Sequence, residues 1–141
     1  MQKIHFYFFD RRPALKDRKS LKHFIENLFG KEKTPLTSLS YIFCSDERLL
    51  EVNIEFLKHD FYTDVITFDL SREKGIVEGE VYLSVDRIKE NAKQLGLSFN
   101  EELHRVMFHG ALHLCGYKDK SKDEASDMRS MENKYLRQYF K

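Results

Sequence analysis

Two histidines lie four residues apart in the stretch HGALHLCGYKD, residues 109–119, within a run that reads as a helix. Residues four apart share one helix face, with Cβ atoms about 5–6 Å apart, so both imidazoles can reach one metal ion. Gly116 stands where a helix can end in a left-handed residue at no steric cost, which would turn Asp119 back toward the same ion. Two imidazoles and one carboxylate with an open fourth position form a catalytic type of zinc site. We therefore predict that His109, His113 and Asp119 bind one Zn²⁺ per chain.

The spacing of the histidines alone leaves a second interpretation open, because a histidine on a helix is more often a surface or core residue with a satisfied ring. The helix is apolar on most of its faces, which indicates that it is buried. Buried imidazoles need polar partners, and this favours the metal site. Position 110 is Gly, so the Glu of the His-Glu-x-x-His zinc peptidases is absent.

The composition indicates a soluble protein with one domain, residues 1–141, and one core. Hydrophobic residues make up 41% and charged residues 33% of the chain, and the net charge is +1, so the overall charge does not identify a polyanionic partner. The sequence contains no apolar run of the roughly 20 residues that a membrane helix needs, and no secretory signal pattern. Two cysteines are too few for a disulfide framework, which suggests the reducing cytoplasm.

Periodicity divides the chain into short strands and amphipathic helices. The last two strands are expected to form a hairpin, and Ser98 with Glu101 has the form of a capping box. The first helix is expected to end at Gly30. The predicted strands cover residues 2–9, 37–44, 63–68 and 77–85, and the predicted helices cover 17–29, 46–57, 86–95, 98–114 and 121–140.

The pattern HGxLHLxGY at residues 109–117 resembles the signature of the YbeY family, single-strand-specific metallo-endoribonucleases of rRNA maturation. Asn53 with Asp60, then residues 63–68 and 79–84, resemble further blocks of that family in the same order. The resemblance implies an α+β fold, a small mixed four-stranded sheet packed with about five helices, with the metal site on a buried helix and the following loop. It also implies a zinc-dependent hydrolase acting on single-stranded rRNA in ribosome biogenesis and quality control, with the ribosome as partner and no small-molecule cofactor.

The chain departs from the family pattern at the third metal ligand, which is a histidine in the family. An ungapped match places Asp119 there, and a carboxylate is an ordinary zinc ligand. An alternative match inserts Lys118 and sets Lys120 opposite the histidine, which leaves a two-histidine site that Asp123 or Glu124 could complete.

A second departure is Leu57, which stands where the family usually has an arginine. Lys58 or His59 could take its place, and we predict Lys58 as a substrate-binding residue and His59 as a catalytic residue that handles the proton. Phe61 or Tyr62 could stack on unpaired bases. The simpler interpretation of these residues is an exposed turn with aromatic packing.

Two further features bear on RNA contact. Residues 10–33 hold eight Lys and Arg against four Asp and Glu, which fits either a solvated helix face or a surface that meets RNA phosphates. Asp64 is interpreted as a turn or cap residue. Two rival functions remain, a metallohydrolase of another substrate such as a peptide, and a ribosome- or RNA-binding protein with a structural metal.

Overall fold

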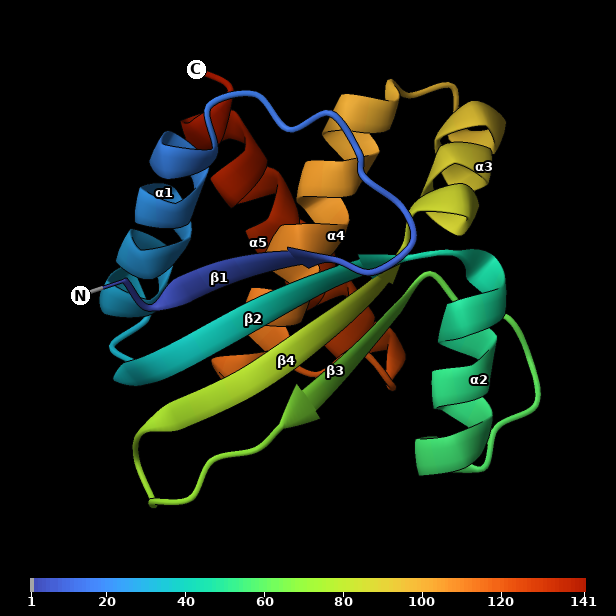
Figure 1. Cartoon of the computed structure of the whole chain (residues 1–141). Coiled ribbons are helices and arrows are strands. Elements are labelled where there is room, and N and C mark those ends of the chain that lie inside the picture. Colours follow the sequence, from blue (N-terminus) through green and yellow to red (C-terminus); the bar gives the residue numbers. More distant parts are fainter. Residues whose placement is uncertain (1) are drawn as a thin grey trace.

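Four strands form one mixed sheet in the order β1-β2-β4-β3 (Figure 1). The computed structural model describes residues 2–141. Strands β1, β2 and β4 are parallel, and β3 pairs with β4 in antiparallel orientation, which confirms the predicted hairpin and mixed sheet. The strands are β1 (Ile4–Phe8), β2 (Leu36–Cys44), β3 (Val65–Asp69) and β4 (Val77–Ser84).

Five helices accompany the sheet within residues 2–141, and every strand or helix begins and ends within two residues of its predicted bounds. Four of the helices begin after a serine whose side chain accepts the backbone N–H three residues later, the usual way of satisfying an orphan amide at a helix start. The helices are α1 (Arg18–Lys31), α2 (Asp46–Leu57), α3 (Val85–Leu95), α4 (Phe99–Leu114) and α5 (Lys122–Tyr139).

The expected end of the first helix at Gly30 is wrong, because α1 continues through this residue to Lys31. The left-handed residue after this helix is Lys33, with φ 55°. The N–H of Thr34 then bonds to the carbonyl of Phe29 at 2.9 Å and closes the helix end.

The two faces of the sheet are covered differently. Helices α1 and α4 cover one face, and α5 packs on α4. Together they enclose the main core, in which Tyr41, Phe43 and Leu83 are fully buried. On the other face, α2 lies beside the β3 edge and buries Leu49 against Ile66. Figure 1 shows α1 beside β1, at the sheet edge opposite β3.

Helix α4 is buried as expected, and two glycines explain how closely it approaches the sheet. A Cβ at Gly110 would lie 2.8 Å from the Cγ atoms of Val81, and a Cβ at Gly79 would lie 2.9 Å from Leu114. The branched Val81 side chain cannot easily move aside, so glycine at position 110 lets α4 pack this closely against β4. At Gly79 a Cβ would also lie 2.9 Å from the backbone oxygen of Phe68. Gly110 therefore has a packing role at the position where zinc peptidases carry their catalytic Glu. No helix within residues 2–141 is both long and apolar enough to cross a membrane.

Candidate metal centre and its cleft

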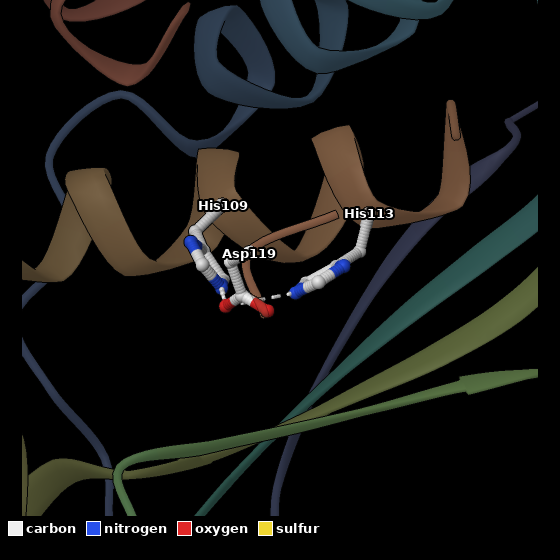
Figure 2. A group of neighbouring side chains, drawn as sticks. All are labelled: His109, His113 and Asp119. Carbon is white, nitrogen blue, oxygen red and sulfur yellow. Dashed lines mark ion pairs between the residues drawn. The ribbon is translucent and has the colours of Figure 1, made fainter. Parts of the chain in front are cut away.

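The three predicted ligands converge on one point. His109 and His113 project from successive turns of α4, and Asp119 reaches them from the loop between α4 and α5 (Figure 2). Each histidine Nε2 atom lies 3.4 Å from Oδ2 of Asp119, and the ligand atoms of all three residues lie within 4.8 Å of one another.

The two 3.4 Å distances fit a shared ion better than they fit hydrogen bonds. Ligand atoms at 2.0–2.2 Å from a tetrahedral zinc ion stand about 3.3–3.6 Å apart, whereas a charge-assisted hydrogen bond measures about 2.7–2.9 Å. The group formed by His109, His113 and Asp119 could therefore hold a metal ion.

The loop that carries Asp119 turns back in the manner predicted. Gly116 has a φ of 105°, a conformation that a residue with a side chain adopts only at a steric cost. The N–H of Tyr117 then bonds to the carbonyl of Leu112 at 3.1 Å. The turn thus brings a residue six positions beyond His113 back beside its ring.

Glu132 on α5 contacts the imidazole of His109 at Nδ1, the ring nitrogen that does not approach Asp119. Nδ1 of His109 lies 2.6 Å from Oε2 of Glu132, so the ring donates this proton to the carboxylate and leaves Nε2 free for an ion. Burial lowers the pKa of His109, but the hydrogen bond and charge of Glu132, with the charges of Asp119 and Asp64, outweigh burial and raise that pKa above its ordinary value.

Glu132 is a functional residue that was missed in the sequence, because it lies 23 residues beyond His109. One signal could have found it. Met128, Tyr135 and Leu136 form the buried face of α5, and position 132 falls on that face by helical spacing. A glutamate there needs a buried polar partner.

Arg105 compensates the buried charge of Glu132. Its Nη1 atom donates to Oε1 of Glu132 at 3.2 Å and to Oδ1 of Asn133 at 2.9 Å, while Nε lies 3.7 Å from Glu102. The Arg105 side chain is only 12% exposed. Burial raises the pKa of Glu102, against the lowering effect of Arg105. This cluster supports His109 through a network that is itself largely buried.

Glu32, which follows α1, ties the ligand loop to α5. It accepts the hydroxyl of Tyr117 at 2.8 Å and the hydroxyl of Tyr135 at its other oxygen. Burial and the adjacent Glu32 carboxylate raise the pKa of Tyr117 to about 12, so this phenol remains a proton donor at neutral pH. The tether fixes a residue only two positions before Asp119.

We expect Tyr117→Phe to lower the free energy of unfolding by about 1.5–3 kcal/mol, the usual value of a hydrogen bond to a charged group, and to weaken metal binding because Asp119 loses its anchor. Urea denaturation and metal titration measure the two effects. Tyr7→Phe is the matched control, since Tyr7 is 54% exposed on the sheet and its loss should change neither quantity. Unchanged stability and metal affinity in Tyr117→Phe would refute the tether.

A cleft of about 650 Å³ opens beside His109, His113 and Asp119. One wall consists of the end of α2 and the loop after it, with Asn53, Leu57, His59 and Phe61. Strand β3 and helices α4 and α5 form the rest. His109, His113 and Asp119 therefore all face this open space.

The other predicted site residues differ in their relation to this cleft. His59 lines it, and its ring stacks on Phe61 with centroids 5.1 Å apart. Lys58 is not among the lining residues, and its Nζ atom donates to the carbonyl of Glu55 at 3.2 Å. Tyr62 lies under the guanidinium of Arg87, 5.0 Å from its ring centroid.

Asp64, interpreted as a turn residue, stands directly before β3 and also lines the cleft. Its carboxylate accepts a 3.4 Å hydrogen bond from the amide of Asn91. Burial raises its pKa, while hydrogen bonds and the charge of His109 lower it.

Of the alternative ligands, Glu124 caps α5 by accepting the N–H of Ser121 at 3.0 Å. The basic helix α1 lies at the sheet edge opposite the β3 side of the cleft.

Comparisons with known proteins agree with this arrangement. The family model described as Endoribonuclease YbeY matches residues 10–140. A protein from Cytophaga hutchinsonii named Endoribonuclease YbeY is 46% identical over 94% of this chain and 93% of its own length. A protein of the same name from Bacteroides thetaiotaomicron is 44% identical over 89% and 90%. A solution structure from Thermotoga maritima is similar with a TM-score of 0.67 and 30% identity, covering 93% of this chain and 86% of that one.

Proposed function

This chain belongs to the endoribonuclease YbeY family, and we propose that it is a Zn²⁺-dependent hydrolase that cleaves single-stranded regions of ribosomal RNA. The ribosome as partner and a cytoplasmic location belong to the same proposal. The observation that supports it most directly is the convergence of His109, His113 and Asp119 beside an open cleft.

The donor set favours zinc among the biological metals. Imidazole nitrogens suit zinc and neighbouring transition metals, whereas magnesium and calcium prefer sites made of oxygen atoms. Three protein ligands leave a fourth position open, as in catalytic zinc sites. A zinc ion held there would supply an activated water and stabilise charge on a phosphate oxygen.

The chain's own residues would prepare the site for this chemistry. Glu132 fixes the His109 tautomer and keeps Nε2 directed toward Asp119. We propose that His59 accepts or donates the proton during phosphodiester hydrolysis, since it lines the cleft and imidazole does both near neutral pH. Phe61, 55% exposed in the cleft wall, would stack on an unpaired base.

Lys58 is proposed to contact the RNA backbone outside the cleft. Its amine now bonds to the last turn of α2, at the carbonyl of Glu55. The residue is exposed, so the side chain can exchange this bond for a phosphate when RNA enters beside it. A contact of this kind would position RNA without reading its sequence.

The test compares three substrates for the purified protein, a single-stranded RNA, the same RNA in a duplex, and casein. We expect one equivalent of zinc, cleavage of the single strand alone, loss of cleavage on chelation with the fold retained, and recovery on adding zinc. Product gels, metal analysis and circular dichroism measure these results. Casein cleavage would indicate a peptidase. Intact RNA with bound zinc, or unfolding on chelation, would indicate a structural metal.

A further inference from the structure

Carboxylates outnumber cations around the cleft. Its lining includes five carboxylates and two guanidiniums, and no lysine lines it within residues 2–141. An RNA backbone carries one negative charge per nucleotide, so its entry depends on cationic contacts. The carboxylates are Asp64, Asp69, Glu102, Asp119 and Glu132, and the guanidiniums are Arg105 and Arg129.

Arg105 is already committed to contacts inside the protein. Its Nη1 atom bonds to Glu132 and Asn133, and its Nε and Nη2 atoms lie 3.7 Å and 3.9 Å from Glu102 and Glu101. Only 12% of the side chain is exposed, and carboxylates compensate its charge. Its Nε atom is buried without a hydrogen-bond partner, so Arg105 offers a ligand in the cleft few accessible donors.

Arg129 differs from Arg105 in both respects. It stands one helical turn before Glu132 on α5, with 58% of its side chain exposed. Its Nη1 atom lies 3.8 Å from Oε1 of Glu132, which is beyond hydrogen-bond distance. The guanidinium thus lies beside the carboxylate that orients His109, with its donors available to a ligand in the cleft.

The wall formed by α2 offers the cleft no comparable cation. Leu57 presents an apolar side chain there. Lys58, which is proposed to contact the RNA backbone outside the cleft, is not among the lining residues. A phosphate beside the metal ligands would therefore find its protein cation on α5. The guanidinium fork also matches two oxygens of one phosphate, which a lysine amine cannot do.

We propose that Arg129 binds the phosphate group of the RNA segment at the metal centre, from the α5 side of the cleft. This inference rests on the proposed function, because it assigns the phosphate contact of the same substrate. Arg129 is then a substrate-binding residue. Its 3.8 Å distance from Glu132 follows from the spacing of the two residues along α5.

The test compares Arg129→Gln with Arg129→Lys and with the matched control Arg137→Gln, which removes an exposed arginine elsewhere on α5. We expect Arg129→Gln to lower kcat/KM for single-stranded RNA by about 10- to 100-fold, the lysine variant to lose less, and the control to lose nothing. Metal content and melting temperature should stay at the wild-type values.

A binding measurement separates this inference from the proposed function. A labelled single-stranded 2′-O-methyl oligonucleotide, checked for integrity on gels, serves as the probe. Arg129→Gln should weaken its binding and reduce the slope of log affinity against log salt by about 0.7. Equal affinity and slope in wild type and Arg129→Gln would overturn the inference. Tight binding lost in Arg129→Gln, with no cleavage by the wild type, would support the phosphate contact and refute the nuclease.

A double variant distinguishes phosphate binding from a structural role. Leu57→Arg in the Arg129→Gln background returns a guanidinium to the cleft from its other wall, and we expect partial recovery of kcat/KM and of oligonucleotide affinity. A role in supporting Glu132 would not be restored from α2. Loss of metal in Arg129→Gln without recovery in the double variant would make Arg129 structural and overturn the inference.

Discussion

Replacing His113 with alanine is expected to remove the bound metal and to reduce cleavage of single-stranded RNA by at least about a hundredfold. The reason is that the site loses one of three ligands, and metal catalysis contributes several kcal/mol, with tenfold in rate for each 1.4 kcal/mol. His113 is the informative choice because the structure pairs its Nε2 with Asp119, whereas His109 also bonds to Glu132. Its side chain is 29% exposed, so the fold should survive. Metal analysis, RNA gels and a melting curve measure the three properties.

The matched variants for His113→Ala are Asp119→Ala and Asp119→His. Asp119→Ala should lose the metal, as His113→Ala does. Asp119→His introduces the residue of the family pattern and should retain the metal, because the number of ligands is preserved. Equimolar metal and full activity in Asp119→Ala would show that the third ligand lies elsewhere. Asp123 or Glu124 would then be the residue to replace.

Replacing Glu132 with alanine is expected to affect stability and metal binding together. The carboxylate is 6% exposed and pairs with both His109 and Arg105. Removing one partner of a buried ion pair costs about 3–5 kcal/mol, because the remaining charge stays buried without compensation. Losing the partner of a ligand histidine weakens metal affinity by about 10- to 100-fold. Urea denaturation of the metal-free protein and zinc titration of the folded protein measure the two effects separately.

Glu101→Ala is the control for Glu132→Ala. Glu101 also approaches Arg105, at 3.9 Å, but its side chain is 42% exposed, and ion pairs of this kind contribute about 0–1 kcal/mol. We expect almost no change in stability or zinc affinity. If Glu132→Ala behaved like this control, the carboxylate would not support the metal site, and the orientation of His109 would have to come from the packing of α4 alone.

Local patterns along the chain predicted much of the fold and the grouping of His109, His113 and Asp119. Serines at 45, 84, 98 and 121 precede four helices, and cap geometry depends only on neighbouring residues. The histidine pair is equally local, since the helical repeat alone places positions 109 and 113 on one face. The turn at Gly116 could be predicted for the same reason, because a positive φ is a property of a single residue.

Contacts between distant segments escaped this kind of prediction. Glu132 supports His109 across 23 residues, and Tyr117 meets Glu32 across 85. Periodicity shows that a side chain is buried but does not name its partner. Asp64 lines the cleft because β3 lies next to α4. The residues adjacent to Asp64 in the sequence do not show that these two elements are neighbours.

The sequence by itself determined the helices and strands, the histidine pair on α4 and the position of Asp119 on the following loop, because each depends on backbone geometry over a few residues. Only the tertiary structure decided that Glu132 stands behind His109, that Arg105 neutralises it, and that Arg129 remains open to the cleft. The physical reason is that these roles depend on how α4 and α5 pack against each other. That packing is set by the whole core, in which Gly110 and Gly79 allow α4 to approach β4 closely.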